Sequence, residues 1–375
     1  MKNVYIIGGG PAGMMAAISL KLHHNVNVTI LEKNAQLGRK LLLTGGGRCN
    51  LTANVDSKTV IDNTPKNSKF LYSCMKEFGP QSIIEFFKSH GLDLIEEEKN
   101  KIFPASLKSM DVLKTLMKVI NQLNIKILFN QTVSKIDVVK KIISSDKEIF
   151  KFDKLIIAAG GITYPVTGSD GSGFRLSSET HHHIINPKLS LVPLVSNDLF
   201  IQKKALQGLS FKDINISISG RKSPIIKDDL IFTHYGISGP AVLKISYYVV
   251  ELLSETNNIE LKIDFLPDIN HIDITQELVN KYIPKRMIDF LKEKNLNFSY
   301  LKDFKINIYT NKGINDAFVT NGGVDTKEID HKTMRSKVNE DISFAGEIID
   351  VNANTGGYNL TICFATGFVA GKYLF

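Results

Sequence analysis

VYIIGGGPAG, residues 4–13, is the stretch that decides the fold. Its apolar start, Val4–Ile7, is typical of a buried parallel strand, and its glycines fit the pattern G-x-G-x-x-G. Residues 14–24, MMAAISLKLHH, then have the apolar face of a helix, and a second apolar run, residues 26–31, ends at Glu32. Strand, glycine turn, helix, strand and acid in this order predict a dinucleotide-binding fold, which a lone glycine motif would not.

The residues of this turn indicate which dinucleotide binds. Gly8 permits the tight turn, Gly10 lets the backbone approach a pyrophosphate, and Gly13 allows the helix to pack closely on the strand. The helix N-terminus presents N–H groups and a partial positive charge to the phosphates. The Glu32 carboxylate would accept hydrogen bonds from ribose hydroxyls and repel a 2′-phosphate, so FAD or NAD is favoured over NADP.

The C-terminal part of the chain favours FAD over NAD. ISFAGE, residues 342–347, is an apolar run that ends in glycine and an acid, and an apolar helix follows the NTGGYN turn at residues 354–359. In flavoproteins of the glutathione reductase type, such a strand places a carboxylate on the ribityl chain. The following helix directs its dipole at the flavin and stabilises negative charge there. Residues 154–161 resemble the mid-chain strand of the same class, so three separate elements predict FAD.

Longer motifs make the sequence resemble the bacterial BaiN-type NAD(P)/FAD-dependent oxidoreductases, aminoacetone oxidase-like flavoproteins that include the ribosomal RNA dihydrouridine synthases. The resemblance covers nearly the whole chain. The main motifs that carry it are GRKLLLTGGGRCNLTAN (38–54), GGITYPVTGSDGSGF (160–174), FTHYGISGPAVL (232–243) and FAGEIIDVNANTGGYN (344–359). The resemblance implies an α/β fold, in which a glutathione-reductase-type FAD-binding Rossmann-like domain is interrupted by an inserted β-barrel-like module with a small helical subdomain.

The domain boundaries follow from a change of pattern near Pro187. Alternating runs such as INISIS, residues 214–219, are typical of half-buried strands. The expected parts are residues 1–188 for the first part of the FAD domain, 189–326 for the insert, and 327–375 for the second part of the FAD domain. Periodicity further predicts helices over residues 68–90, 109–123, 275–294 and 313–320, a strand over 125–130 and a hairpin over 137–152.

The candidate cofactor contacts come from the motifs and from the resemblance, which places the GGGRCN loop along the FAD. They are Gly8, Gly10, Pro11, Ala12, Gly13, Glu32, Lys33, Arg39, Lys40, Gly46, Gly47, Arg48, Cys49, Asn50, Ala159, Gly160, Gly161, Gly346, Glu347, Asp350, Gly356, Gly357, Tyr358 and Asn359. No second G-x-G-x-x-G follows a strand as the first does, so NAD(P)H is expected to bind only transiently as electron donor.

The candidate catalytic residues are Cys49, Tyr164, His234 and Tyr235. Cys49 has two open interpretations, a small residue packed beside the cofactor or a thiol general acid near flavin N5. Tyr164, His234 and Tyr235 lie in loops that could reach the flavin, but buried Tyr and His often only satisfy loop carbonyls. A redox sensor that uses Cys49 without turnover is a further alternative.

Composition limits the class of protein. The chain has 46 Lys and Arg residues against 38 Asp and Glu, and the formal charge of +8 weakly favours a polyanionic partner. Three cysteines without a C-x-x-C pair fit neither a zinc site nor a disulfide framework and favour a reducing cytoplasm. The side chains of His181–His183 diverge on any regular element, so no metal is expected there. No apolar run reaches the roughly 20 residues that span a bilayer.

The insert is rich in basic residues, which are Lys203, Lys204, Arg221, Lys222, Lys281, Lys285, Arg286, Lys292 and Lys294. They are either a solvated helical face or a phosphate-binding surface for ribosomal RNA. The function expected from the resemblance is an FAD-dependent oxidoreductase that uses a nicotinamide donor to reduce an activated C=C, with uridine in 23S ribosomal RNA converted to dihydrouridine. The alternative is a reductase or oxidase of a small molecule, such as a steroid-like enone or an amine.

Overall fold

Residues 1–221, 223–270 and 273–375 are described by the structure, which is a computed structural model. The chain forms two compact units, Met1–Pro187 with Val319–Phe375, and Lys188–Phe318. The second unit is therefore an insertion into the sequence of the first. The chain returns to the first unit at Val319, whereas the sequence placed this return near residue 327.

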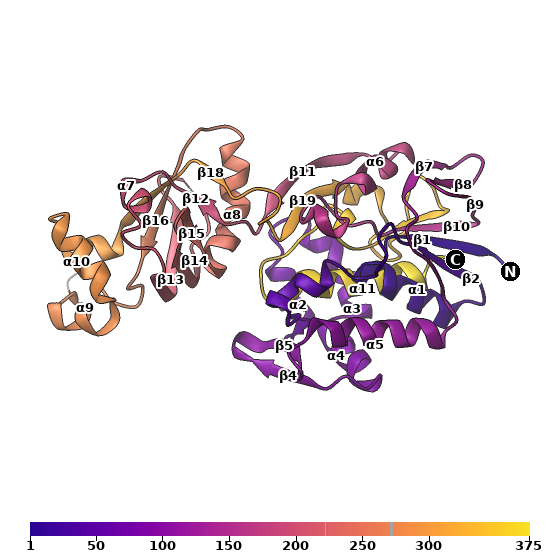
Figure 1. The fold of residues 1–375 in the computed structure, drawn as a ribbon, viewed down its shortest axis with the longest axis horizontal. Coiled ribbons are helices and arrows are strands. Elements are labelled where there is room, and N and C mark those ends of the chain that lie inside the picture. The colour runs from indigo at the N-terminus through magenta and orange to yellow at the C-terminus, as the bar shows by residue number, and fades with distance from the viewer. Residues whose placement is uncertain (222, 271–272) are drawn as a thin grey trace. The chain divides into compact units, whose positions relative to one another are not determined.

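A five-stranded parallel sheet lies at the centre of the first unit (Figure 1). Ile7 pairs with Leu31 on one side and with Ile157 on the other, so three strands end at the same level. The Val- and Ile-rich strands suit a parallel sheet that is covered on both faces. In sheet order they are β20 (Ile342–Phe344), β10 (Lys154–Ile157), β1 (Asn3–Ile7), β2 (Asn27–Leu31) and β6 (Lys126–Leu128). The predicted α/β class is confirmed.

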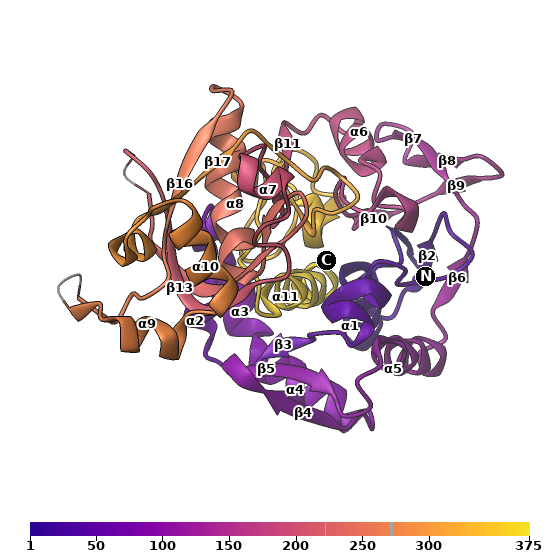
Figure 2. The same cartoon turned by 60° about the vertical axis from the view of Figure 1, so that its left-hand side comes forward.

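Helices α1 (Pro11–His23) and α11 (Tyr358–Lys372) lie side by side in the first unit (Figure 2). Their contact is made by small residues. A Cβ on Gly367 would lie 2.4 Å from the carbonyl oxygen of Ala12, and a Cβ on Gly371 would lie 2.3 Å from that of Ala16. Backbone therefore meets backbone along this contact, and the start of each helix is fixed relative to the other.

Smaller elements complete the first unit. The helix predicted over residues 68–90 is interrupted at Gly79, because Pro80 begins a new helix, and the predicted hairpin over 137–152 is part of a three-stranded antiparallel sheet. The helices are α2 (Ser57–Asp62), α3 (Tyr72–Glu77), α4 (Pro80–Ser89), α5 (Ser109–Gln122) and α6 (Ser172–Glu179). The strands are β3 (Thr52–Ala53), β4 (Leu94–Glu97), β5 (Lys101–Pro104), β7 (Val133–Asp137), β8 (Ile142–Ser145), β9 (Ile149–Lys151), β11 (Ile184–Ser190) and β19 (Val319–Val324).

The histidine triplet follows α6 and is structural. His182 is buried, with one ring nitrogen 2.8 Å from Thr180 Oγ1 and the other 2.6 Å from Ser336 Oγ. Burial lowers the pKa of His182, which favours the neutral ring. Among the described residues, no group of three or more His, Cys, Asp or Glu side chains is arranged to hold a metal ion. In the same part of the chain, no helix combines the length and apolarity needed to cross a membrane.

A seven-stranded antiparallel sheet forms the second unit, where the sequence predicts a β-barrel-like module. The helix predicted over residues 313–320 is wrong. Gly313 adopts a φ of +84° in a turn, and the β-branched residues that follow begin strand β19. In sheet order the strands are β17 (Phe304–Ile308), β16 (Ile259–Asp264), β13 (Ser210–Ile218), β14 (Ile226–Phe232), β15 (Gly236–Ser238), β12 (Leu194–Val195) and β18 (Thr310–Asn311). The helices are α7 (Leu199–Gln202), α8 (Pro240–Leu253), α9 (Gln276–Tyr282) and α10 (Lys285–Glu293).

Lys302 is a buried cation in the core of the second unit. Its ammonium group donates to the carbonyl oxygens of Leu266 and Ile269, at 2.6 and 2.7 Å, and lies 2.9 Å from Asp264 Oδ2. All three N–H groups of the ammonium thus have acceptors, and the segment between β16 and α9 is tied to the sheet through one side chain.

Lys302→Met should destabilise the protein by about 3 kcal/mol, because Asp264 and two carbonyls lose their buried partner. Lys262→Met is the matched control on the same sheet, since the Lys262–Asp303 pair is 3.1 Å long but its side chains are 44% and 47% exposed. It should cost at most about 1 kcal/mol. Thermal and urea unfolding of both variants measure the change in the free energy of unfolding. An equal decrease in the two variants would contradict a central role for Lys302.

Candidate functional site

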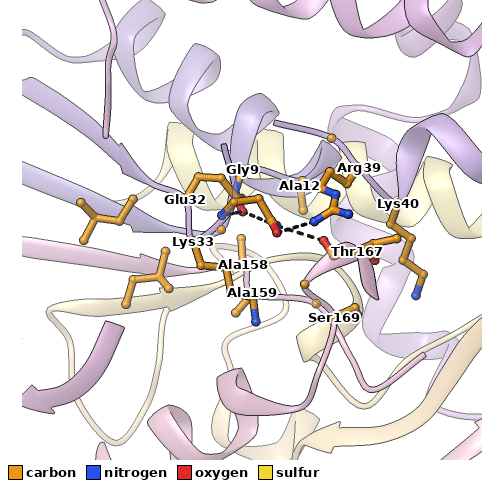
Figure 3. Close-up of a pocket in the computed structure, with 18 of the residues that line it drawn as sticks. Gly9, Ala12, Glu32, Lys33, Arg39, Lys40, Ala158, Ala159, Thr167 and Ser169 are labelled. Carbon is orange, nitrogen blue, oxygen red and sulfur yellow. Dashed lines mark hydrogen bonds between the residues drawn. The ribbon is translucent and has the colours of Figure 1, made fainter. Parts of the chain in front are cut away.

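A cleft opens at the carboxyl ends of β1, β2 and β10 (Figure 3). Its empty space is about 910 Å³, open solvent included. The edge of a parallel sheet beyond the strand ends is where α/β folds bind their ligands. Among the predicted cofactor contacts, those that line this cleft are Gly8, Gly10, Pro11, Ala12, Glu32, Lys33, Arg39, Lys40, Ala159, Gly160 and Glu347.

The glycines of the first turn have different surroundings. Gly8 has a φ of +104°, and a Cβ there would lie 2.4 Å from the carbonyl oxygen of Ala158. A Cβ on Gly13 would lie 1.9 Å from the carbonyl oxygen of Gly8, so α1 packs directly on the turn. A Cβ on Gly10 would meet nothing within 4 Å. Gly8 and Gly13 are thus required by the protein itself, whereas Gly10 leaves space in the cleft that a ligand can use.

Glu32 organises one end of the cleft. Its Oε2 accepts from the backbone N–H of Gly9 at 2.8 Å, and its Oε1 accepts from both nitrogens of Asn34, at 2.8 and 2.7 Å. Asn34 also donates to the carbonyl of Thr167 at 3.0 Å and accepts from Arg39 at 2.8 Å. Sequence analysis missed Asn34, although a polar residue two positions after the acid is a signal for such a turn. Oε2 accepts one hydrogen bond and keeps a second lone pair for a ribose hydroxyl, whereas Oε1 already accepts two.

Lys40 and Glu347 form an ion pair at another part of the cleft. Lys40 Nζ lies 2.7 Å from Glu347 Oε2 and 2.6 Å from Thr163 Oγ1, while Glu347 Oε1 accepts from the backbone N–H of Thr320 at 2.8 Å. The pair joins the loop after β2 to the loop after β20. It is held from β19 by Thr320, which sequence analysis did not single out. Lys33 is likewise paired, at 2.7 Å from Asp170.

The GGGRCN loop is strongly bent. Gly45, Gly46 and Gly47 all have positive φ, and a Cβ on Gly46 or Gly47 would meet nothing within 4 Å. Arg48 does not line the cleft described above. Its guanidinium lies 2.9 Å from Glu97 Oε1 and stacks 4.4 Å from the ring centre of Phe103. Its charge is therefore neutralised within the protein, whereas the sequence placed Arg48 among the cofactor contacts.

The other predicted contacts mostly brace the start of α11. With its amide oriented to satisfy both ends, Asn50 donates to the carbonyl of Thr52 and accepts from the N–H of Gly357, each at 3.0 Å. Asn359 accepts from the N–H of Ala353 at 2.9 Å and donates to the same residue's carbonyl at 2.7 Å. The predicted contacts outside the lining of the cleft are Gly13, Gly46, Gly47, Arg48, Cys49, Asn50, Gly161, Gly346, Asp350, Gly356, Gly357, Tyr358 and Asn359.

Asp350, another predicted cofactor contact, is engaged elsewhere. It is buried, its Oδ2 lies 2.8 Å from Lys66 Nζ, and the same oxygen accepts from Asn67 at 3.0 Å. Burial raises the pKa of the Asp350 carboxyl, against the opposing effect of Lys66. These contacts tie the loop after β20 to the segment before α3, so Glu347 is the acid of this loop that faces the cleft.

The four catalytic candidates are divided between the two units. Cys49 is fully buried and belongs to the core of the first unit, and burial raises the pKa of its thiol to about 12. This favours the packing interpretation over the general acid. Tyr164 is half-buried in the first unit, with a left-handed φ of +55° before a proline. His234 and Tyr235 lie in the second unit. Their ring centres are 4.9 Å apart, and Lys312 Nζ lies 4.6 Å from the centre of the Tyr235 ring.

The residues of the cleft fit a bound dinucleotide. The first turn of α1 begins with Pro11 and presents free N–H groups beside the open space at Gly10. Glu32 Oε2 offers a lone pair at the end of β2, and Lys40 supplies a cation that Glu347 holds in place. These groups match a ribose, a pyrophosphate and a polyhydroxyl chain.

Gly10→Val should fold normally but fail to bind FAD. Gly10 has extended backbone angles, φ −78° and ψ −178°, and room for a side chain, which would then occupy the space required by the pyrophosphate. The flavin-to-protein ratio after incubation with FAD and the melting temperature without it measure the two effects. Gly13→Val is the contrast and should lower the melting temperature. A fully loaded, yellow Gly10→Val protein would contradict this placement of the phosphates.

Comparison with known proteins places the chain among flavoenzymes. It is 30% identical to a 3-dehydro-bile acid Δ(4,6)-reductase of Clostridium scindens, over 99% of this chain and 98% of that protein. It is 27% identical to a ribosomal RNA dihydrouridine synthase of Haemophilus influenzae, over 97% and 96%. The fold resembles that of a 3-ketosteroid Δ1-dehydrogenase from Sterolibacterium denitrificans, with a TM-score of 0.56 and 10% identity over 100% of this chain and 99% of that one.

A family model described as the HI0933-like protein Rossmann domain matches residues 2–373. The resemblance found from the sequence motifs is thereby confirmed. The chain belongs to the HI0933-like Rossmann family of FAD-dependent oxidoreductases.

Proposed function

We propose that this oxidoreductase uses a nicotinamide donor to reduce a ring C=C conjugated to a carbonyl, and that its substrate is uridine in 23S ribosomal RNA. The observation that carries the first part is the chemistry shared by its relatives. A dihydrouridine synthase reduces the C5=C6 bond of uracil, which is conjugated to the C4 carbonyl, and a bile acid Δ(4,6)-reductase acts on double bonds conjugated to the 3-oxo group. Both reactions add a hydride and a proton across an electron-poor double bond.

When bound, FAD supplies the hydride transfer between the nicotinamide and the substrate. The task of this chain is to bind and orient the reactants. The first turn of α1 would hold the pyrophosphate, Glu32 the adenosine ribose, and the Lys40–Glu347 pair the ribityl chain. The dipole of α11 would favour negative charge on the flavin ring. For uracil, hydride adds to C6 and a proton to C5, and the proton donor is sought among Tyr164, His234 and Tyr235.

The charge of the chain supports an RNA substrate. The formal charge is +8, and the second unit carries exposed cations that have no carboxylate partner among the described residues, as detailed below. A polyanion gains affinity at such a surface through release of its counterions, which a neutral or singly charged steroid does not. A paired uridine would have to leave its stack before reduction.

A second candidate substrate is a small conjugated enone. The 30% identity with a bile acid reductase over nearly the whole chain favours it. The two candidates require the same flavin chemistry and differ in what the protein must recognise.

Deletion of the gene should remove one dihydrouridine from 23S ribosomal RNA, and the wild-type gene should restore it. Mass spectrometry of RNA from both strains measures this, because dihydrouridine is heavier than uridine by two hydrogens. Purified holoenzyme with NADH or NADPH should form the same product on unmodified RNA. The proposal of uridine would be contradicted if the dihydrouridine content of the RNA is unchanged in the deletion strain. Reduction of a steroid dienone by the purified enzyme would then favour the small-molecule substrate.

Cys49→Ala should leave the rate of product formation unchanged in a single turnover of the reduced enzyme, because the buried thiol is a packing residue. The substitution should instead lower the melting temperature, because it leaves a small cavity in the core. Cys74→Ala is the matched control, since burial likewise raises the pKa of that buried thiol to about 12. Loss of a general acid slows the chemical step by on the order of 100-fold or more. A decrease of that size in the single-turnover rate of Cys49→Ala, but not of Cys74→Ala, would show that the Cys49 thiol is the proton donor.

A further inference from the structure

Most lysines of the second unit that lie on its sheet or core have a carboxylate partner. Lys244 Nζ, for example, lies 2.7 Å from the buried Asp228, and Lys227 Nζ lies 2.8 Å from Asp268. The other pairs of this kind are Lys188–Glu251, Lys262–Asp303, Lys302–Asp264 and Lys305–Glu260. Carboxylate pairing is thus common among the lysines of the sheet and core, to which cations without a carboxylate partner are an exception.

Five cations on the helical side of this unit form such an exception, and we call them the basic cluster. All five are exposed, and within the described ranges none has a carboxylate oxygen within 4.0 Å. They are Lys203, Lys204, Lys281, Lys285 and Arg286. Lys222, which the sequence grouped with them, lies outside the described residues.

The cluster is brought together by packing between α7 and the α9–α10 hairpin. The Phe200 ring of α7 meets the Phe290 ring of α10 edge to face, with 5.7 Å between centroids. Arg286, at the start of α10, donates to the carbonyl of Gln207 in the segment after α7. Lys203 and Lys204 lie between Phe200 and Gln207, the two residues that make these contacts, and Lys281 lies in the last turn of α9.

The local charge is large for so few residues. Segments 199–207 and 276–294 hold seven Lys or Arg residues and three Asp or Glu, a net charge of +4 against +8 for the whole chain. Like charges that gather without counter-charges repel one another and oppose compact folding. A bound polyanion would offset this repulsion. Tyr282, between Lys281 and Lys285, is 57% exposed, and Lys281 Nζ lies 5.1 Å from its ring centre.

The burial of the apolar side of α10 favours nucleic acid over an anionic lipid surface as the polyanionic partner. A helix that binds a lipid surface needs a free apolar face to enter the acyl region. Met287, Ile288 and Leu291 are instead buried in the core of the second unit. The exposed residues of α10 are all charged, and the exposed ring of Tyr282 lies at the end of α9. Cations that follow phosphates, with an aromatic ring for a base to stack on, are the combination that binds single-stranded nucleic acid.

We propose that the basic cluster, with Tyr282, is the docking surface for the RNA substrate, where the cations contact phosphates and the tyrosine stacks on an unpaired base. The inference rests on the proposed function, because it assumes that RNA is the substrate. It adds the place at which RNA is held and separates binding, carried by the second unit, from flavin chemistry, carried by the first.

The test is fluorescence anisotropy of a labelled oligouridylate mixed with holoenzyme between about 50 and 200 mM salt. The quadruple variant Lys203→Gln, Lys204→Gln, Lys281→Gln, Lys285→Gln should bind more weakly. Its slope of log affinity against log salt should be smaller by about three, since each phosphate contact on a single strand contributes about 0.7. Tyr282→Ala should weaken binding without changing the slope, because stacking releases no counterions.

A charge-matched control keeps the result specific. Lys88, Lys118, Lys126 and Lys147 are exposed lysines of the first unit, and their fourfold change to Gln should leave affinity and slope as in the wild type. Flavin content and NADH-driven flavin reduction should be normal in all variants, which shows that each is folded. Wild-type affinity and slope in the cluster variant would overturn the docking surface while leaving uridine reduction untouched.

Two further outcomes concern the partner. If the wild-type enzyme reduces a steroid dienone but binds no oligouridylate, the RNA substrate fails, and the docking surface fails with it. Binding to phosphatidylserine vesicles that depends on the cluster and exceeds binding to the oligouridylate would also overturn the proposal, in favour of a lipid surface.

Discussion

The contact between α1 and its neighbours is the constraint on which the rest of the structure depends. At three places a Cβ would collide with a carbonyl oxygen, which are Gly13 against Gly8, Gly367 against Ala12, and Gly371 against Ala16. Glycine lets α1 approach both the turn that precedes it and α11. Because α1 begins directly after the turn that follows β1, this close packing sets the positive end of its dipole at the cleft.

Charge around the cleft is arranged by pairs that cross the fold. Lys40 and Glu347 come from loops about 300 residues apart in sequence and meet at 2.7 Å. Glu32 is fixed by Gly9 and Asn34 before any ligand arrives. Groups held in this way need little rearrangement on binding, so less of the binding energy is lost in ordering side chains. The basic cluster differs in this respect, because its cations have no carboxylate partner within the described chain.

The sequence predicts those features that depend on neighbours along the chain. The strand, glycine turn, helix and acid of residues 4–32 are confirmed, as are the parallel strand and glycine that precede Glu347. Features that depend on distant partners are missed. Arg48 is neutralised by Glu97, Asp350 is paired with Lys66, and residues 319–324 form a strand because β11 lies beside them. Asn34 and Thr320 matter only through their contacts with Glu32 and Glu347.

The measurement that tests the central claim most directly is an anaerobic two-step mixing experiment on the FAD-loaded enzyme. NADH or NADPH should first bleach the yellow flavin, and unmodified ribosomal RNA or a conjugated enone should then restore the colour, with one double bond reduced for each flavin reoxidised. The account would be contradicted if both nicotinamides leave the flavin oxidised, or if the reduced flavin is reoxidised by oxygen but by neither substrate.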